Sequence, residues 1–288
     1  MKKESAPRLM LVAAMTIFGT IGFFVRNIPI PSAQLAFFRA VIAVAVIGSY
    51  LLFGRRGLKV PARQLPLLAI SGAAIGINWI LLFEAYRYTT VSVATLSYYF
   101  APVIVTAVCP ILFKEKLTIK QLICFVMSTV GLVLITGFGT TGNGTDTVGI
   151  LFGLGAAVFY ATAVLMNKHI RDADGMQRTF WQFLAAAVVL LPYVLLSGGF
   201  QLQKLELMGW LCLLIVGLVH TGICYCLYFS ALKELPGQKA AILSYIDPLV
   251  AVIVSVVLLH ETMDLWQILG GLLILGFTLL NEIKLKKK

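Results

Sequence analysis

Charged residues are scarce in this sequence. They make up 12% of its 288 residues, whereas a typical soluble domain contains about 25%. Hydrophobic residues make up 60% of the chain, so a soluble fold would have too few polar side chains to cover its surface. A protein surrounded by hydrocarbon needs no such cover. The composition therefore excludes an ordinary soluble domain and favours an integral membrane protein.

Sequence motifs of common enzymes are also absent. The chain contains no Walker phosphate-binding loop, no His-Glu-x-x-His and no Gly-x-Ser-x-Gly. Its five cysteines lie inside apolar segments without the spacing of metal ligands. We therefore expect no enzymatic activity, no cofactor and no metal. The net charge of +11 does not indicate a nucleic-acid partner, because the basic residues lie between apolar runs without interleaved aromatic residues.

What the sequence does contain is a series of apolar runs of membrane-spanning length, which is about 20 residues for a helix. We predict an all-α protein with ten transmembrane helices and short connections. The predicted spans are Leu9–Arg26, Ser32–Phe53, Leu65–Tyr88, Val91–Phe113, Gln121–Phe138, Val148–Met166, Thr179–Ser197, Leu207–Leu232, Ala240–His260 and Trp266–Ile283. The first of them has the basic start of a signal peptide but no clear cleavage site, so we expect it to be retained as a helix.

The positions of Lys and Arg predict the orientation of these helices. If the N-terminus is cytoplasmic, 19 of the 23 basic residues lie in cytoplasmic segments. Only Arg26, Arg87 and Lys204 then lie outside, and Arg39 lies within a span. This bias is the expected one for a membrane protein, and a miscounted helix would destroy it. We predict a multi-pass protein of a bacterial inner membrane, in contact with membrane lipid, with both termini in the cytoplasm.

The two halves of the chain match each other at an offset of 146 residues. Residues 76–121 align with residues 222–267 without a gap, and the alignment pairs Tyr99 with Tyr245, Pro102 with Pro248 and Glu115 with Glu261. We therefore divide the chain into a first repeat (1–138), a connecting loop (139–147) and a second repeat (148–288). Five helices per repeat is an odd number, so the second repeat is inverted in the membrane, an arrangement typical of transporters.

In these features the chain resembles an EamA-type member of the drug/metabolite transporter superfamily along essentially its whole length. The resemblance is carried by the two five-helix repeats, by Tyr99-Phe-Ala-Pro102 and Tyr245-Ile-Asp-Pro248, and by the glutamates that close those helices. Arg39 matches the arginine of the family's second helix, whereas Lys114 and His260 stand where the family usually has Gly. The resemblance implies a ten-helix bundle with a central cavity lined mainly by helices 1, 3, 4, 6, 8 and 9, and the export of small metabolites.

Asp247 is the sharpest candidate for function, because an aspartate at the centre of a spanning helix costs about 2.5 to 3.5 kcal/mol on insertion scales. It directly precedes Pro248, which removes a backbone donor and interrupts the helix. We expect Asp247 to bind substrate or to carry a proton, with a buried structural acid as the alternative. His220 lies at a similar depth on the preceding helix and is a candidate partner in proton coupling, or else a histidine satisfied by a backbone carbonyl.

Arg39 and Glu84 lie in the outer halves of the second and third helices. We expect a structural ion pair between them, and the alternative is that Arg39 binds a substrate carboxylate with its planar guanidinium group. The glutamates that end the paired helices, Glu115 and Glu261, are expected to make structural or gating contacts with a helix terminus.

Aromatic and amide side chains in the spans are candidates for lining a central site. The repeat pairs Trp79 with Tyr225 and Tyr99 with Tyr245, and Asn78 precedes Trp79. Such rings stack on a ligand or cover a cation, although each is equally able to pack against a neighbouring helix.

Together these observations predict a secondary transporter of a small-molecule substrate such as an amino acid, most simply an exporter working by alternating access. An importer or facilitator of the same substrates and a membrane-embedded lipid-processing enzyme are the alternatives. Protons are a candidate coupling ion, and the sequence is compatible with a monomer or a homodimer.

Overall fold

The computed structural model describes residues 5–54, 57–113, 118–137, 144–167, 169–170, 173–235 and 243–282. Within these ranges the protein consists of helices and connections, with no β-strand. The helices are α1 (Ser5–Gly19), α2 (Ile21–Arg26), α3 (Ser32–Phe53), η2 (Ala62–Gln64), α4 (Leu65–Tyr88), α5 (Val91–Tyr98), α6 (Ala101–Phe113), α7 (Ile119–Gly137), α8 (Gly144–Asn167), α9 (Gly175–Leu196), η3 (Leu202–Lys204), α10 (Leu207–Leu214), η4 (Ile215–Ile223), α11 (Cys224–Glu234), α13 (Ile246–Val257) and α14 (Leu265–Glu282). The predicted all-helical fold is therefore confirmed.

Seven helical stretches in the described residues are long and apolar enough to cross a membrane, and three further apolar helices are shorter. The shorter ones are Ile119–Leu134, Ile246–Val257 and Leu265–Asn281. Each of the ten predicted spans overlaps one of these helical stretches. By length and composition the seven longer stretches show a multi-pass membrane protein.

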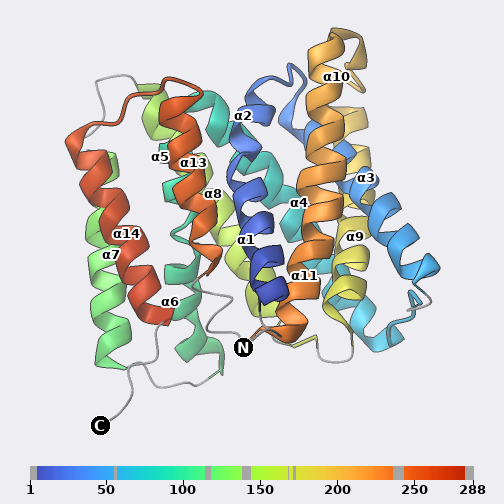
Figure 1. Ribbon diagram of the computed structural model, residues 1–288, viewed down its shortest axis with the longest axis horizontal. Helices are drawn as coiled ribbons and strands as arrows, with labels where there is room; N and C mark the ends of the chain where they lie inside the picture. The colour runs from blue at the N-terminus through green and yellow to red at the C-terminus, as the bar shows by residue number, and fades with distance from the viewer. Residues whose placement is uncertain are drawn as a thin grey trace.

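The helices lie side by side, and α1 begins at the same end of the molecule at which α14 ends (Figure 1). We call this the lower end, and the opposite end, where α2 ends and α10 begins, the upper end. Helix α4 packs against α8 and α9, α3 packs against α9 and η4, and α7 pairs with α14 at one edge.

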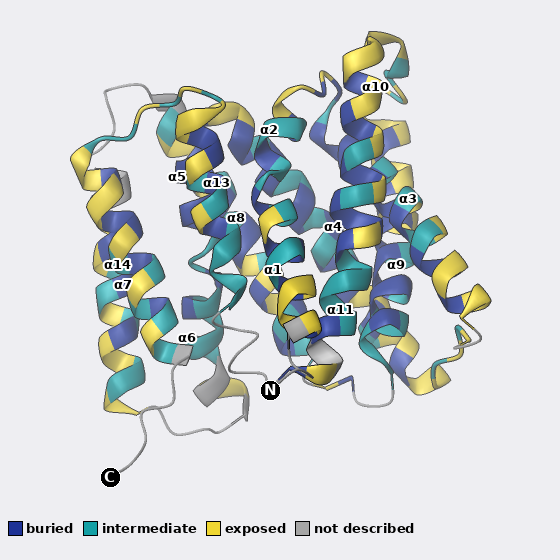
Figure 2. Cartoon of the chain, viewed as in Figure 1, coloured by how far each residue is buried: buried dark blue, intermediate teal, exposed yellow. Residues whose placement is uncertain are grey.

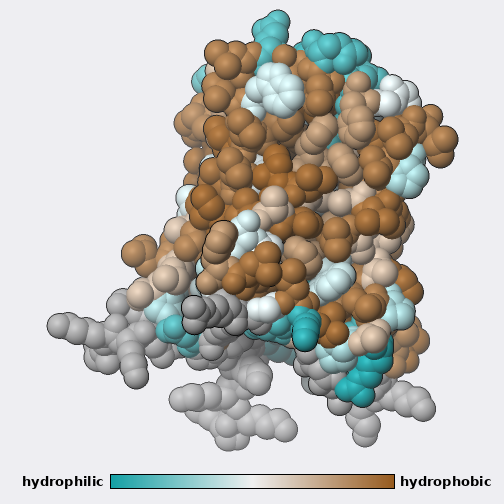
Figure 3. All heavy atoms as spheres, turned by 90° about the vertical axis from the view of Figure 1, so that its right-hand side faces the viewer, coloured by the Kyte–Doolittle hydropathy of each residue, from teal (hydrophilic) through white to brown (hydrophobic). Residues whose placement is uncertain are grey.

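Burial and hydropathy divide the helices into inner and outer faces. Buried residues face the interior, and exposed residues lie on the outside of the bundle (Figure 2). The outer faces carry large apolar side chains such as Leu151, Val188 and Leu272, which are 63%, 63% and 64% exposed. In Figure 3 hydrophobic side chains cover most of the face shown, and strongly hydrophilic ones gather near its ends. An apolar outer surface of this extent suits contact with lipid tails.

Both helices of the Tyr-x-x-Pro repeat are interrupted in the middle. The predicted span Val91–Phe113 consists of α5 and α6, separated by a turn at Tyr99 and Phe100. In the second repeat Tyr245 is a turn residue directly before α13. A proline lacks a backbone N–H, and its ring clashes with the carbonyl four residues earlier. Pro102 and Pro248 therefore account for breaks at equivalent positions in the two repeats.

Glycine at position 72 permits a close contact between α4 and α9. A Cβ atom added at Gly72 would lie 2.3 Å from the carbonyl oxygen of Gln182 and 2.7 Å from the Cβ of Ala185. Because backbone atoms cannot move aside cheaply, such an atom would force the two helices apart.

We therefore expect Gly72→Ala to lower the free energy of unfolding by about 1–3 kcal/mol, as overpacking usually does. Gly276→Ala is the matched control, because an added Cβ there meets nothing within 4 Å, and it should be neutral or stabilising by about 0.5–1 kcal/mol. Thermal unfolding of the two variants in detergent measures the difference. Equal midpoints would contradict the close packing at Gly72.

Candidate functional site

A cavity of about 300 Å³ lies in the interior of the bundle. This volume is at the lower end of the range for small-molecule sites, which is about 300–1,000 Å³. Its lining comes from both halves of the chain and comprises Met15, Phe18, Ile21, Arg39, Asn78, Trp79, Leu82, Tyr86, Thr95, Tyr98, Tyr99, Ala101, Pro102, Tyr160, Tyr225, Tyr228, Ser244, Tyr245 and Asp247. We call it the central cavity.

Asp247 lines the central cavity from the first turn of α13. The hydroxyl of Tyr99 donates a hydrogen bond of 2.8 Å to its Oδ2 atom. The acid therefore stands at the break in the second repeat and is bonded to the tyrosine at the break in the first. A helix N-terminus favours a negative charge at this position. Interrupted helices are tolerated at membrane depth where they line a cavity, and the residues at both breaks, Tyr99 and Tyr245, line this one.

Arg39 lines the same cavity from α3 and is only 4% exposed. Its Nε donates a hydrogen bond of 2.7 Å to the hydroxyl of Thr221. The Cζ of its guanidinium group lies 4.3 Å from the centre of the Trp79 ring and 5.6 Å from that of Phe83. These contacts hold the planar group against an aromatic face and leave its other N–H groups for a ligand.

The expected ion pair between Arg39 and Glu84 is wrong. Among the described residues Glu84 makes no salt bridge, and Arg39 bonds to Thr221 instead. The reason is the helical periodicity of α4. Trp79 and Phe83 are four residues apart and share the face that meets Arg39, whereas Glu84 is rotated from Phe83 by about 100°.

The remaining residues predicted to bind substrate also line the central cavity. They are Tyr99, Tyr245, Trp79, Tyr225 and Asn78. The rings of Tyr99 and Tyr245 lie 6.5 Å apart, so the paired aromatics of the two repeats meet in one wall. The amide of Asn78 donates to the carbonyl of Ala156 at 2.7 Å. This bond fixes α4 to α8 and gives Asn78 a structural contact as well as a place in the lining.

His220 does not line the central cavity, and the structure does not bring it into contact with Asp247. Its Nε2 lies 2.9 Å from the hydroxyl of Thr20, and its Nδ1 lies 3.3 Å from the carbonyl oxygen of Ile215. Thr20 is the residue between α1 and α2, and η4, which contains His220, is a π-helix. The histidine therefore connects two irregular segments, which is the structural alternative to proton coupling.

Tyr86 and Thr221 are among the polar residues at the site that were not predicted. Tyr86 lines the cavity and lies 3.5 Å from the Thr95 hydroxyl. Thr221, which orients Arg39, donates its own hydroxyl proton to the carbonyl of Val216 at 2.8 Å. The sequence signal was weak, because neither residue belongs to a motif or to an identical pair in the internal repeat.

Glu261 lies at the upper end in a compact cluster. Its Oε1 forms an ion pair of 2.7 Å with Arg26, and its Oε2 accepts a hydrogen bond of 2.8 Å from the backbone N–H of Val91. The hydroxyl of Ser255 also donates to Oε2. We call Arg26, Val91, Ser255 and Glu261 the upper cluster. The carboxylate thus meets the first residue of α5, a helix terminus, whereas Glu115 lies outside the described residues.

Comparison with known proteins agrees with this architecture. The EamA-like transporter family matches residues 7–137 and again residues 147–282. An uncharacterized transporter of Bacillus subtilis (strain 168), YxxF, is 30% identical over 291 residues, which is 100% of this chain and 93% of that protein. An uncharacterized transporter of Archaeoglobus fulgidus is 29% identical over 271 residues, 94% of each chain.

A solved crystal structure has the same fold. It superposes with a TM-score of 0.68 and covers 96% of this chain and 98% of its own, at 18% sequence identity. The family model matches both halves of the chain, and the helical architecture agrees with it. The chain therefore belongs to the EamA-like transporter family.

Proposed function

We propose that this protein is a secondary transporter, most simply an exporter, of a zwitterionic small metabolite such as an amino acid, working by alternating access. The proposed architecture is ten spanning helices in two inverted repeats, residues 1–138 and 148–288, joined by 139–147. The double family match supports this division, as do the breaks at Tyr99 and Tyr245 in equivalent positions. Inverted repeats around a site at the interrupted helices are a common plan for such transporters.

The observation that carries the proposal is a cation and an anion in one aromatic cavity that are not bonded to each other. Arg39 bonds to Thr221 and Asp247 to Tyr99, and no ion pair joins the two charges within the described part of the chain. A buried charge is stable only when it is paired or hydrogen-bonded. A ligand with a carboxylate and an ammonium group would complete both sites at once.

The distribution of Lys and Arg supports an orientation of the protein in the membrane. We propose that the lower end faces the cytoplasm, together with both termini, because 19 of the 23 Lys and Arg residues then lie on that side. The upper end, with Arg26, Arg87 and Lys204, then faces away from the cytoplasm. An importer or facilitator would use the same cavity in the opposite or in both directions.

The upper cluster is proposed to close the outer side of the central cavity. It joins the end of α2 to the start of α5 and to the end of α13. Tyr99 directly follows α5, and Asp247 lies in the first turn of α13. Arg26 also donates to the carbonyl of Thr89 at 2.5 Å. In alternating access these contacts would break when the cavity opens outward, and Glu261 would have the predicted gating role.

A matched ligand series tests the substrate class. We expect phenylalanine to raise the thermal unfolding midpoint of the detergent-purified protein, since a ligand of the folded state stabilises it. Phenethylamine and 3-phenylpropionate each lack one of the two charges and should give much smaller shifts. Leucine and alanine, tested in parallel, report how much of the shift depends on the aromatic walls.

A shift as large for either singly charged compound as for phenylalanine would contradict the proposal that both Arg39 and Asp247 bind the ligand. The same series in proteoliposomes, measured as exchange of labelled amino acid, separates transport from binding. Binding without exchange would argue against a transporter.

A further inference from the structure

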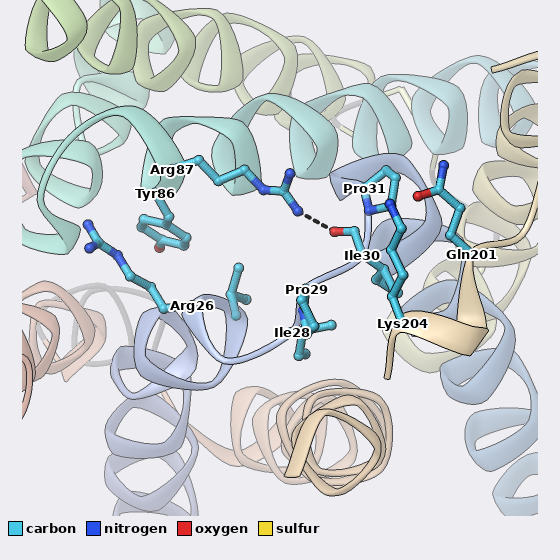
Figure 4. A pocket seen from close by; sticks show the side chains of 10 residues that line it. Arg26, Ile28, Pro29, Ile30, Pro31, Tyr86, Arg87, Gln201 and Lys204 are labelled. Carbon is cyan, nitrogen blue, oxygen red and sulfur yellow. Dashed lines mark hydrogen bonds between the residues drawn. The ribbon is translucent and has the colours of Figure 1, made fainter. Parts of the chain in front are cut away.

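A second cavity, of about 440 Å³, opens at the upper end of the molecule. It lies between the segment that joins α2 to α3, the end of α4 and helix η3 (Figure 4). Three basic side chains line it, Arg26, Arg87 and Lys204, and none of its described lining residues is acidic. We call it the upper cavity.

The three basic residues of the upper cavity are also the only ones that the charge count assigns to the outer side of the membrane. Lysine and arginine are rare on that side, and like charges repel one another when they are brought together. Three outer cations that converge on one hollow, from α2, α4 and η3, therefore indicate a site for negative charge.

The geometry leaves these cations able to bind a ligand. Figure 4 shows Arg26 and Lys204 on opposite sides of the cavity, with Arg87 between them. Arg87 donates one N–H to the carbonyl of Ile30, and a guanidinium group has five such donors. Arg26 shares its charge with Glu261. The Lys204 ammonium has no side-chain partner among the described residues.

The backbone that carries Lys204 is fixed to the body of the protein. The amide of Gln34, in the first turn of α3, donates to the carbonyl of Gly199 at 2.5 Å, and its oxygen accepts from the N–H of Gln201 at 2.9 Å. Pro29 and Pro31 stiffen the opposite wall. The walls of the cavity are therefore held in place before a ligand arrives, which lowers the entropy cost of binding.

We propose that the upper cavity binds an oxyanion, a carboxylate or phosphate group, through Lys204 and Arg87. Tyr86 lines both the upper and the central cavity. Tyr86 is therefore part of the wall between a bound anion and the cavity that contains Arg39. The binding itself does not depend on the proposed transport function.

Thermal unfolding in a neutral detergent, with inorganic phosphate exchanged for chloride at constant ionic strength and pH, tests the site. We expect a saturable rise of the midpoint for the unmodified protein. Lys204→Gln should raise the apparent Kd for phosphate by about tenfold, the effect of losing one charge-assisted contact of about 1.4 kcal/mol. Acetate in place of phosphate should give a weaker shift with the same dependence on Lys204.

Two control variants separate this site from other effects of phosphate. Phosphate also stabilises proteins non-specifically by exclusion from their surface. Lys59→Gln removes an exposed cation outside the upper cavity and should leave the Kd unchanged. Asp247→Asn alters only the central cavity and should also leave it unchanged. A shift that does not saturate, or one that is equal in Lys204→Gln and Lys59→Gln, would overturn the proposal.

Lipid nanodiscs identify the source of the oxyanion. In phosphatidylcholine discs the phosphate shift should persist. If phosphatidylglycerol removes the phosphate shift and itself stabilises the unmodified protein but not Lys204→Gln, the natural ligand is a lipid headgroup. If the phosphate shift is the same in both discs, it is a soluble anion. A change in the phosphate Kd in Asp247→Asn but not in Lys204→Gln would place the anion in the central cavity, where the loss of the Asp247 charge favours it, and would overturn the proposal.

Discussion

Replacement of Asp247 by asparagine is expected to reduce amino-acid exchange by 10- to 100-fold while the protein remains folded. Asn has nearly the same shape, and the Tyr99 hydroxyl can donate to its carbonyl oxygen as it does to the carboxylate. The variant loses only the negative charge that would pair with a ligand ammonium. A hydrogen bond to a charged group contributes about 1.5–3 kcal/mol, which corresponds to that range in affinity. Exchange of labelled phenylalanine in proteoliposomes is the measurement.

Glu84→Gln is the matched control for this variant, because it removes another acid within a span that does not line the central cavity. It should leave the exchange rate within about twofold, as expected for a residue without a bonded partner among those described. If Asp247 also carries a coupling proton, Asp247→Asn should lose the response of uptake to an imposed pH gradient, whereas Glu84→Gln should keep it. Unchanged exchange and an unchanged response to the gradient in Asp247→Asn would show that its role is structural.

Replacement of Glu261 by glutamine is expected to open the outer side of the central cavity. The substitution removes the charge that pairs with Arg26 and weakens the hydrogen bonds from Val91 and Ser255. The Glu261 side chain is 9% exposed but that of Arg26 is 34% exposed, so solvent screening keeps the cost below the value of about 3–5 kcal/mol for breaking a fully buried pair. A shift of even 1.4 kcal/mol would change the open population tenfold. A cysteine placed at Leu82, which lines the cavity, should then react faster with an impermeant maleimide added outside.

Glu206→Gln is the control for Glu261→Gln. Glu206 is an exposed acid next to α10 at the same end of the molecule, with no side-chain partner among the described residues. It should not change the labelling rate of the cysteine at Leu82. Faster labelling from the cytoplasmic side instead, or no change with Glu261→Gln, would contradict a role for the upper cluster in closing the outer side.

The sequence predicted the features that depend on single residues and on strong patterns. Apolar runs predicted the helices because hydrocarbon tolerates few other structures. Pro248 predicted an interruption beside Asp247, since a proline breaks the backbone hydrogen bonding wherever it stands in a helix. The internal repeat predicted that Tyr99 and Tyr245 would be equivalent, and both line one cavity.

The features that the sequence did not predict depend on rotation of one helix against another. Arg39 was expected to meet Glu84, but the contact is decided by which face of α4 is turned toward α3, and Trp79 occupies that face. His220 was expected to act with Asp247, but it is turned toward Thr20 instead. Similar depth in the membrane does not fix the direction in which a side chain points, because tertiary packing sets it.

The π-helical segment η4 has a consequence for the aromatic wall of the central cavity. The backbone hydrogen bonds of a π-helix join residues five apart, one more than in an α-helix. Within this segment the side-chain hydroxyl of Thr221 also donates to the carbonyl of Val216. If the same residues formed a regular α-helix instead, the helix after this segment would be rotated by about 100° relative to the helix before it. The side chains of Tyr225 and Tyr228, which line the cavity, would then be turned out of it. One additional amino acid therefore sets the register of the whole second half of this span.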